Sequence, residues 1–231
     1  MPIYFQGVLN ASPARSGVDL LPTILFLIPF AAAAGGFLTK FGRYRPLHYV
    51  GFALMIISFG LFSSLNSHSS VAEWVIYQGI GATGAGLILP VLLPAVQVSL
   101  TETDTALATS TWTFVRSFGL IWGATIPSAV FNNRANTLIQ KIDDPAAAAL
   151  LSNGSAYEHA TKAFLGSISD LTLRNQVIDV FTAALKTVWY VSIAFASLGF
   201  VLVNLEKEVK LRKDLETEFG IAEKKGLNAK D

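Results

Sequence analysis

The segment GGFLTKFGRYRPLHYVGFALMI, residues 35–56, holds three cations and a turn-forming glycine between two runs that are almost free of polar side chains. These two runs are residues 20–39 and 47–65. Neither contains a Lys, Arg, Asp or Glu residue. About 20 apolar helical residues cross the roughly 30 Å hydrocarbon core of a bilayer, so each run is long enough to span it. The pattern predicts two membrane helices joined by a basic hairpin at residues 40–46, in which Gly42 permits the turn and Arg43 and Arg45 contact anionic headgroups.

The remainder of the chain adds three runs of the same kind. Residues 74–100 and 187–205 carry no Lys, Arg, Asp or Glu, and residues 106–131 carry only Arg116. The 231 residues are 52% hydrophobic and 14% charged, with a mean hydropathy of +0.50, which is too apolar for an ordinary soluble domain. Core helices of a large soluble protein are an alternative, but five such runs would leave too little polar sequence to cover them. We therefore expect an all-α integral membrane protein with five full spans.

The charges of the chain are sorted to the two ends of these spans. Ten Lys and Arg residues fall in the hairpin and in the tail at residues 206–231, against six on the opposite side. The positive-inside rule then places the hairpin, the loop at residues 101–105 and the tail in the cytosol, and the tail is expected to form a short surface helix.

Three segments become external loops: residues 9–19, 66–73 and 132–186. The last is expected to carry an amphipathic helix, because a sixth crossing would bury several charges at about 2.5–3.5 kcal/mol each. Asn153 begins an N-x-S acceptor for glycosylation in the same loop.

Residue types that usually carry chemistry are sparse in this chain. There is no cysteine, and the three histidines lie at span ends or in loops without metal-ligand spacing. The net charge of +1 gives no reason to expect nucleic acid as a partner. A membrane-embedded enzyme would need acids or histidines inside the spans, and the spans hold no acid. We expect neither catalysis nor a bound metal or other cofactor.

Arg116 is the one charged residue inside a predicted span. It lies about ten residues from the cytosolic end, at a depth of about 15 Å that is close to the bilayer midplane. Two interpretations remain open: Arg116 snorkels or pairs with backbone carbonyls, or it takes part in a substrate or proton pathway. The spans offer Gln78, Gln97, Trp112 and Thr113 as further candidate residues of such a pathway.

The span at residues 74–100 is rich in glycine and proline. Glycines let a neighbouring helix approach closely, and prolines free backbone carbonyls and kink the helix. Either the glycines serve helix packing alone, or the span flexes and lines a cavity. A nucleotide-binding glycine loop does not fit, since no strand precedes the glycines and no lysine follows them. The residues concerned are Gly79, Gly81, Gly84, Gly86, Pro90 and Pro94.

Four stretches, in their order and spacing, resemble the C-terminal part of a fungal major facilitator superfamily transporter of the fourteen-span drug:proton antiporter type. They are PIYFQGVLNASPARSGVDLLP (2–22), GGFLTKFGRYRP (35–46), YQGIGATGAGLILPVLLPAVQ (77–97) and TFVRSFGLIWGATI (113–126). The family signature G-x-x-x-D-R-x-G-R-R is matched at Gly35, Lys40, Gly42 and Arg43. Its aspartate and last arginine are replaced by Thr39 and Tyr44, a degenerate form typical of the second half of such proteins.

The resemblance implies two six-helix halves that rock around a central site, each built from inverted three-helix repeats. This chain would supply one half, with residues 1–8 as the end of a sixth span, and the N-terminal half would be its missing partner. The implied function is proton-coupled efflux of small organic compounds, such as drugs or toxins, across the plasma membrane, with the proton gradient as energy source. The alternative is a non-transporting remnant, or a half-transporter subunit that needs a partner.

Overall fold

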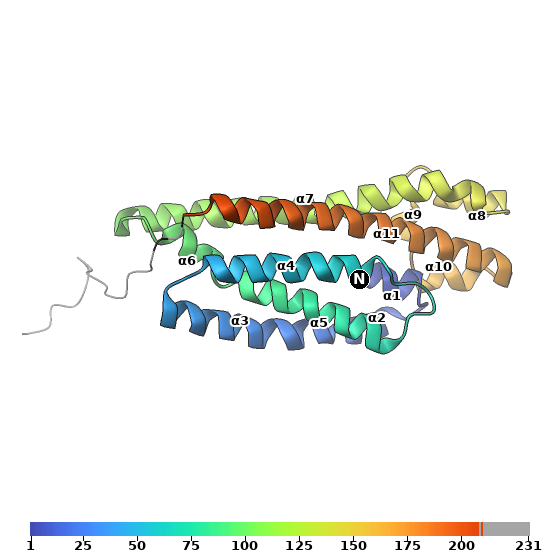
Figure 1. The fold of residues 1–231 in the computed structure, drawn as a ribbon. Helices are drawn as coiled ribbons and strands as arrows, with labels where there is room; N and C mark the ends of the chain where they lie inside the picture. The colour runs from blue at the N-terminus through green and yellow to red at the C-terminus, as the bar shows by residue number, and fades with distance from the viewer. Residues whose placement is uncertain (208, 210–231) are drawn as a thin grey trace, which may run out of the picture.

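The computed structural model describes residues 1–207 and 209, and all regular secondary structure in this part of the chain is helical. Five long helices run along one common axis (Figure 1), and each belongs to a helical segment long and apolar enough to cross a membrane. These helices are α3 (Leu21–Phe41), α4 (Arg45–Phe62), α5 (Val71–Ile88), α7 (Glu102–Leu138) and α11 (Leu171–Leu202). The surface helix expected in the tail lies outside the described residues.

Most of the short helices gather at one end of the bundle (Figure 1). We call this the loop end, because it contains the connection between α4 and α5 at residues 63–70. The opposite end, which we call the hairpin end, contains the turn between α3 and α4 at residues 42–44. The short elements are α1 (Pro2–Gly7), α2 (Pro13–Val18), α6 (Leu92–Gln97), α8 (Pro145–Leu151), α9 (Ala156–His159), α10 (Lys162–Ser167) and the 3₁₀ turns η1 (Ile139–Lys141) and η2 (Val203–Leu205).

Local sequence sets several of the helix ends. Gly42 ends α3 in the left-handed conformation (φ 65°), which glycine adopts without the steric cost of a Cβ atom. Ser70 and Glu73 form a capping box at the start of α5, in which each side chain accepts from the backbone N–H of the other residue. Asp170 begins α11 by accepting a hydrogen bond from the N–H of Thr172.

Helix α5 lies between α3 and α4 and packs closely against both. A Cβ atom added to Gly84 would lie 2.6 Å from the carbonyl oxygen of Gly51 on α4. A Cβ atom added to Gly86 would lie 2.7 Å from the carbonyl oxygen of Leu27 on α3. Both distances are shorter than side chains tolerate, so the three helices pack this closely only because these positions have no side chain.

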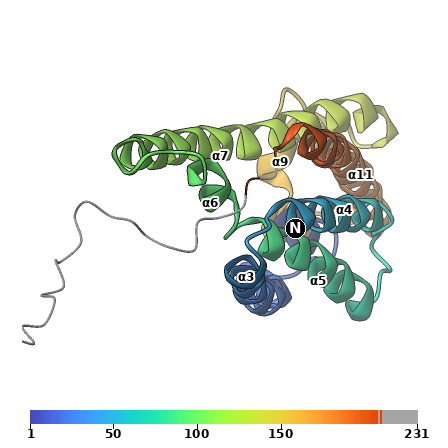
Figure 2. The ribbon, with the colours of Figure 1, turned by 60° about the vertical axis from the view of Figure 1, so that its left-hand side comes forward.

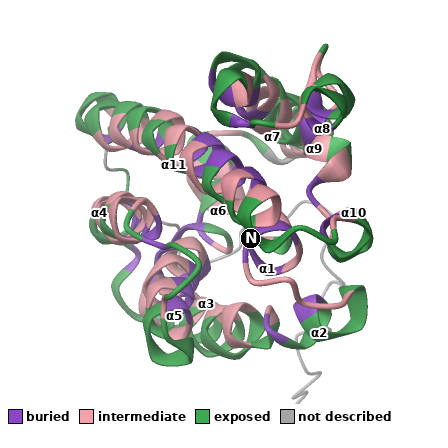
Figure 3. Cartoon of the chain, turned by 90° about the vertical axis from the view of Figure 1, so that its right-hand side faces the viewer, coloured by how far each residue is buried: buried purple, intermediate pink, exposed green. Residues whose placement is uncertain are grey.

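Helix α11 packs against α4 on one side and α7 on the other. The main hydrophobic core lies toward the loop end, where Phe131 of α7 and Phe181 of α11 are fully buried, and Figure 3 shows the buried residues between these helices. The hairpin-end part of α7 extends away from α3, α4 and α5 and keeps α6 beside it (Figure 2). Leu107, Phe114 and Leu120 on this part are 71%, 71% and 66% exposed.

The segment at residues 132–186 differs from the expected loop with a separate amphipathic helix. Residues 171–186 are instead the first half of α11, because no Gly or Pro interrupts the chain between residues 171 and 198. A helix of 32 residues is about 48 Å long, so its charged first half projects beyond a core of about 30 Å. Helix α7 likewise continues to Leu138, and α8, α9 and α10 connect these two extensions.

The glycine- and proline-rich span, expected at residues 74–100, is interrupted. Helix α5 ends at Ile88, a turn follows at residues 89–91, and α6 begins at Leu92. Pro90 lies in this turn, where it has no N–H to continue the helical hydrogen bonds, and Pro94 lies within α6. The other expected spans, at residues 20–39, 47–65 and 106–131, coincide with α3, α4 and the middle of α7, with shifted ends.

Candidate functional site

Arg116 lies on the exposed, hairpin-end part of α7. Its guanidinium carbon is 5.2 Å from the centroid of the Trp112 ring, one turn earlier on the same helix face. A cation over an aromatic ring contributes about 0.5–1 kcal/mol at an exposed position. Within the described residues, no carboxylate forms an ion pair with Arg116. Arg116 and Trp112 are therefore adjacent, and the anion that would balance the charge does not come from this part of the chain.

Gln97 also contacts the hairpin-end part of α7. Its Nε2 donates to the hydroxyl oxygen of Thr109 at 2.7 Å and thereby joins α6 to α7. Thr113 donates its hydroxyl to the backbone carbonyl of Thr109 at 2.8 Å. Thr109 is seven residues, or about two turns, from Arg116. Of the expected pathway residues, Gln97, Trp112 and Thr113 thus lie in the same region of the structure as Arg116.

Gln78 lies elsewhere, between α5 and the start of α3. Its side chain is buried, its Oε1 accepts from the Thr23 hydroxyl at 2.8 Å, and its Nε2 donates to the Asp19 carbonyl at 3.1 Å. Burying an amide is tolerated when both of its ends are hydrogen-bonded, as they are here. The structure therefore does not bring Gln78 to Arg116, and gives it a role in joining α3 to α5.

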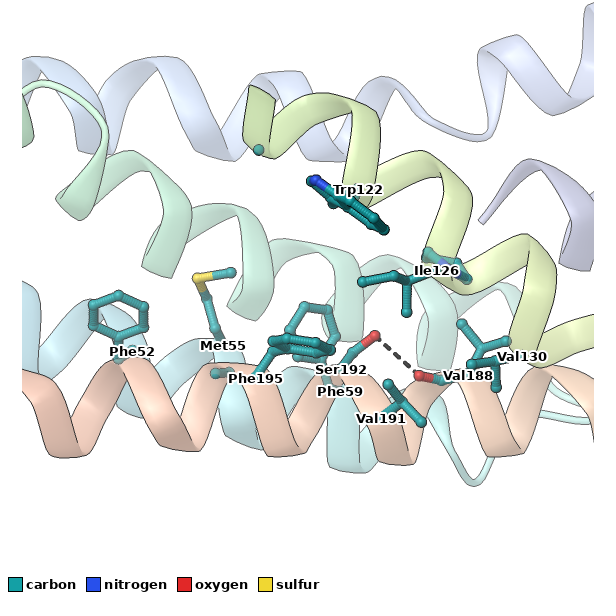
Figure 4. A pocket seen from close by; sticks show the side chains of 14 residues that line it. Phe52, Met55, Phe59, Trp122, Ile126, Val130, Val188, Val191, Ser192 and Phe195 are labelled. Atoms are coloured by element: carbon teal, nitrogen blue, oxygen red, sulfur yellow. Dashed lines mark hydrogen bonds between the residues drawn. The ribbon is translucent and has the colours of Figure 1, made fainter. Parts of the chain in front are cut away.

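An apolar cleft of about 400 Å³ lies between α4, α7 and α11 (Figure 4). Trp122 and Ile126 point into it from α7, and Ser192 and Phe195 approach it from α11. The hydroxyl of Ser192 donates to the Val188 carbonyl at 3.0 Å, within its own helix. The cleft is lined by Phe52, Met55, Phe59, Gly119, Trp122, Gly123, Ile126, Pro127, Val130, Val188, Val191, Ser192, Phe195 and Ala196.

The cleft is suited to binding and not to acid–base chemistry. Its volume falls within the range of about 300–1,000 Å³ that is usual for small-molecule sites. Aliphatic and aromatic walls bind a ligand by removing apolar surface from water and by ring packing. None of the described residues that line it is titratable. What this cleft can do chemically is hold an apolar or aromatic body.

The glycines of α5 lie at helix contacts. A Cβ atom on Gly79 would lie 3.1 Å from the Phe26 ring of α3, and one on Gly81 would lie 2.5 Å from the Ser58 hydroxyl of α4. These contacts, with those of the two later glycines of α5, support the interpretation of the glycines as packing residues. Gly35 is different, because a Cβ atom there would meet nothing within 4 Å.

The basic hairpin contacts η2, the 3₁₀ turn that directly follows α11. Arg45 donates through Nε to the Val203 carbonyl at 3.2 Å and through Nη2 to the Asn204 carbonyl at 3.1 Å. A cation is stabilising at a helix C-terminus, where the last carbonyls lack intrahelical partners and carry the negative end of the helix dipole. Arg45 thus contacts protein carbonyls, and its expected contact with lipid headgroups stays a prediction. Lys40 and Arg43 remain exposed at the hairpin end.

Three neighbouring side chains act with Arg45. The Tyr44 hydroxyl donates to the Lys207 carbonyl at 2.6 Å, and the Tyr49 hydroxyl donates to Oδ1 of Asn204 at 2.7 Å. The imidazole of His48 is buried, and its Nδ1 lies 2.9 Å from Oε2 of Glu206. We call Tyr44, Arg45, His48 and Tyr49 the hairpin clamp.

Asn153, the predicted glycosylation position, lies in the turn between α8 and α9 at the loop end. The side chain is exposed, and its Nδ2 donates to the hydroxyl of Ser152 at 3.2 Å. This position is accessible to modification.

The residues of the hairpin clamp and most residues of the cleft could not be identified as site residues from the sequence. His48 and Glu206 are 158 residues apart, so no local pattern connects them. In the cleft, Phe52, Met55 and Phe59 recur at the spacing of one helix face. The sequence contains this spacing, but the same spacing is equally typical of a helix face that contacts lipid.

Comparison with known proteins gives close relatives over almost the entire chain. The MFS-type transporter gkaD of Penicillium citrinum is 60% identical over 225 residues, which are 97% of this chain and 38% of that protein. The MFS-type transporter pydD of an Acremonium species is 49% identical over 100% of this chain and 40% of that protein. The MFS-type efflux pump LUC4 of a Fusarium species is 47% identical over 97% of this chain and 40% of that protein. No protein-family model and no solved structure matches the chain.

Five long apolar helices, three of which line an apolar cleft, define a multi-pass helical membrane protein. The relatives, at 43–60% identity over nearly the whole chain, define the family. The chain belongs to the fungal MFS-type transporters, that is, to the major facilitator superfamily. It spans about 40% of the length of the relatives that it matches.

Proposed function

We propose that this chain forms part of a secondary transporter that exports small organic compounds in exchange for protons. Two of its relatives are named efflux pumps, LUC4 of a Fusarium species and FUS6 of Gibberella fujikuroi, at 47% and 46% identity. Their similarity covers 97% of this chain, and this observation carries the proposal. In this proposal the proton gradient supplies the energy, no cofactor is bound and no residue is catalytic.

The function can be tested in a chimera, because the chain matches a defined part of a longer relative. The matching 225-residue segment of gkaD from Penicillium citrinum would be replaced by this chain and expressed in a yeast strain that lacks its own efflux pumps. We expect the chimera to lower the retention of rhodamine 6G and a protonophore to abolish this effect. Retention equal to that of the empty vector, with the chimera present at the cell surface, would contradict the proposal.

Arg116 is proposed to act in the transport pathway of that chimera. Arg116→Ala should reduce efflux while surface expression stays unchanged, because the residue is exposed and among the described residues its side chain makes no hydrogen bond or ion pair, only the contact with the Trp112 ring. Arg134→Ala on the same helix is the matched control, since Arg134 is exposed near the loop end. Unaltered efflux of the Arg116 variant would remove this residue from the mechanism.

We further propose that the hairpin end faces the cytosol of a plasma-membrane transporter. The excess of cations in the hairpin and tail supports this orientation. Because the chain has no cysteine, single cysteines can be introduced without background labelling. His68→Cys at the loop end should react with an impermeant maleimide on intact cells, and Lys40→Cys should react only after permeabilisation. The reverse pattern of labelling would overturn the proposed orientation. Imaging of a fluorescent fusion of the transporter tests whether it lies in the plasma membrane.

A second candidate function is a half-transporter that needs a partner chain. The exposed Arg116 on the hairpin-end part of α7 favours it, because no carboxylate of the described residues pairs with this cation and a partner chain would supply one. In that case this chain, expressed alone, should give no efflux and should regain it when the remaining part of gkaD is co-expressed. Efflux by the chain alone would exclude this candidate.

A further inference from the structure

The face of α7 that borders the cleft changes its chemistry along its length. Trp112 and Arg116 lie on the same face as Gly119 and Gly123, because residues three, four and seven positions apart recur on one side of a helix. At about 1.5 Å per residue, Arg116 is roughly 5 Å along the axis from Gly119, where the cleft begins. A cation therefore stands at the hairpin-end edge of the apolar cleft.

Within the described residues, no anion pairs with the guanidinium of Arg116. In the described part of the chain it contacts the Trp112 ring, and its N–H groups donate no hydrogen bond. A cation within a membrane span is costly unless it is paired, and a guanidinium presents a planar fork that fits a carboxylate through two parallel hydrogen bonds. A carboxylate at this position would balance the charge of Arg116 and accept hydrogen bonds from its N–H groups.

We propose that Arg116 and the cleft form one binding site for an amphiphilic carboxylic acid. The carboxylate pairs with Arg116, and the apolar body lies along the cleft between α4, α7 and α11. The part of α7 that lines the cleft, from Gly119 to Val130, is about 16 Å long, which suits an extended aliphatic or terpenoid body. As a substrate class this rests on the export function proposed above, whereas binding itself does not require transport.

The position of Arg116 favours a free organic acid over a membrane phospholipid. Fourteen residues separate it from the start of α7 at Glu102, a distance of about 21 Å along the helix. A phospholipid headgroup stays at the membrane surface, so its phosphate would have to leave that interface to reach Arg116. A single-chain carboxylic acid carries no such headgroup, and its one apolar chain fits in the one cleft.

The test measures binding directly, on the purified chain in micelles of an uncharged detergent. Dibromostearic acid is the probe and its methyl ester is the uncharged control, and their bromine atoms quench the fluorescence of Trp122 in the cleft and of Trp112 beside the cation. We expect the acid to bind about tenfold more tightly than the ester, equivalent to about 1.4 kcal/mol. Unlabelled stearic acid should reverse the quenching.

Variants separate the charge from the cleft. Arg116→Gln should abolish the preference for the acid, and Arg116→Lys should retain part of it, since lysine keeps the charge and loses the fork. Arg134→Gln, the control on the same helix, should leave the preference unchanged. Gly123→Leu should weaken acid and ester alike by fivefold or more, because Gly123 lines the cleft, an added Cβ atom there meets nothing within 4 Å, and the larger side chain occupies volume of the cleft.

The outcomes distinguish this inference from the proposed function. Equal affinities for acid and ester, an unchanged preference in Arg116→Gln, or unchanged quenching in Gly123→Leu with a native circular dichroism spectrum would each overturn the site. Displacement of the probe by phosphatidic acid as effectively as by stearic acid would show a lipid site and overturn it as well. If the acid preference holds while the chimera with gkaD exports nothing, the site stands and the transport proposal fails. If the chimera exports rhodamine 6G and the acid preference is absent, only the present inference fails.

Discussion

The substitution Gly84→Ala tests whether the close approach of α4 and α5 holds the bundle together. The added Cβ atom would lie 2.6 Å from the carbonyl oxygen of Gly51, an atom of the backbone that cannot rotate away. The two helices must separate by about 0.4 Å or more before this contact reaches 3.0 Å, the shortest that real Cβ atoms show. Overpacking of this kind typically costs about 1–3 kcal/mol. A cost of about 2 kcal/mol lowers the ratio of folded to unfolded protein roughly thirtyfold.

The measurement is the thermal unfolding of the purified chain in detergent, followed by circular dichroism. For a chain of this size, about 2 kcal/mol corresponds to a decrease in Tm of about 4–8 °C. Gly119→Ala is the matched control, because its Cβ atom would meet nothing within 4 Å and alanine favours a helix over glycine by about 1 kcal/mol. The control should therefore raise the Tm by a few degrees. Equal Tm values for the two variants would refute the view that α5 is held by backbone contact.

Three further predictions concern the clamp, the buried amide and the loop end. Arg45→Ala removes two hydrogen bonds to carbonyls of η2, directly after α11, so trypsin should cleave after Lys207 several times faster, whereas Lys40→Ala should not change that rate. Gln78→Leu leaves the half-buried Thr23 hydroxyl and the buried Asp19 carbonyl without this partner, and the Tm should fall by about 2–8 °C, a change that would be absent if the amide were solvated. Asn153→Gln should remove an endoglycosidase-sensitive mass shift of the chain expressed in yeast, and a shift that persists would place the modification elsewhere.

The positions of the spans could be predicted from the sequence, because a membrane helix is encoded in one continuous stretch. The runs at residues 20–39 and 47–65 are free of charge, and α3 and α4 occupy nearly the same residues. The turn at Gly42 could also be predicted, since its signal lies in the neighbouring residues. Asp170 is a comparable local signal, an N-cap, for the start of α11, whereas the charge-free run begins only at residue 187, so hydropathy alone places the start of this helix too late.

The contacts between spans could not be predicted in the same way. In a soluble protein the apolar face of a helix points to the core, but lipid is as apolar as protein, so the pattern does not say which face is inside. Phe59 in the cleft and Phe114 on the exposed part of α7 look alike in the sequence. The pairing of Arg45 with Val203 depends on how α4 and α11 meet, and no local rule contains that information.

Helix α7 carries exposed apolar side chains on one side and the exposed Arg116 on the other. Leu107, Phe114 and Ile121 are spaced seven residues apart, lie on one side of the helix and are 71%, 71% and 63% exposed. Arg116 projects from the opposite side, at about 160° from Phe114 around the helix, and it shares that side with Trp112. Acyl chains can cover the first face at no cost, whereas a guanidinium turned to them would be unfavourable by kilocalories. We therefore expect the face with Arg116 to turn away from lipid and toward the cleft.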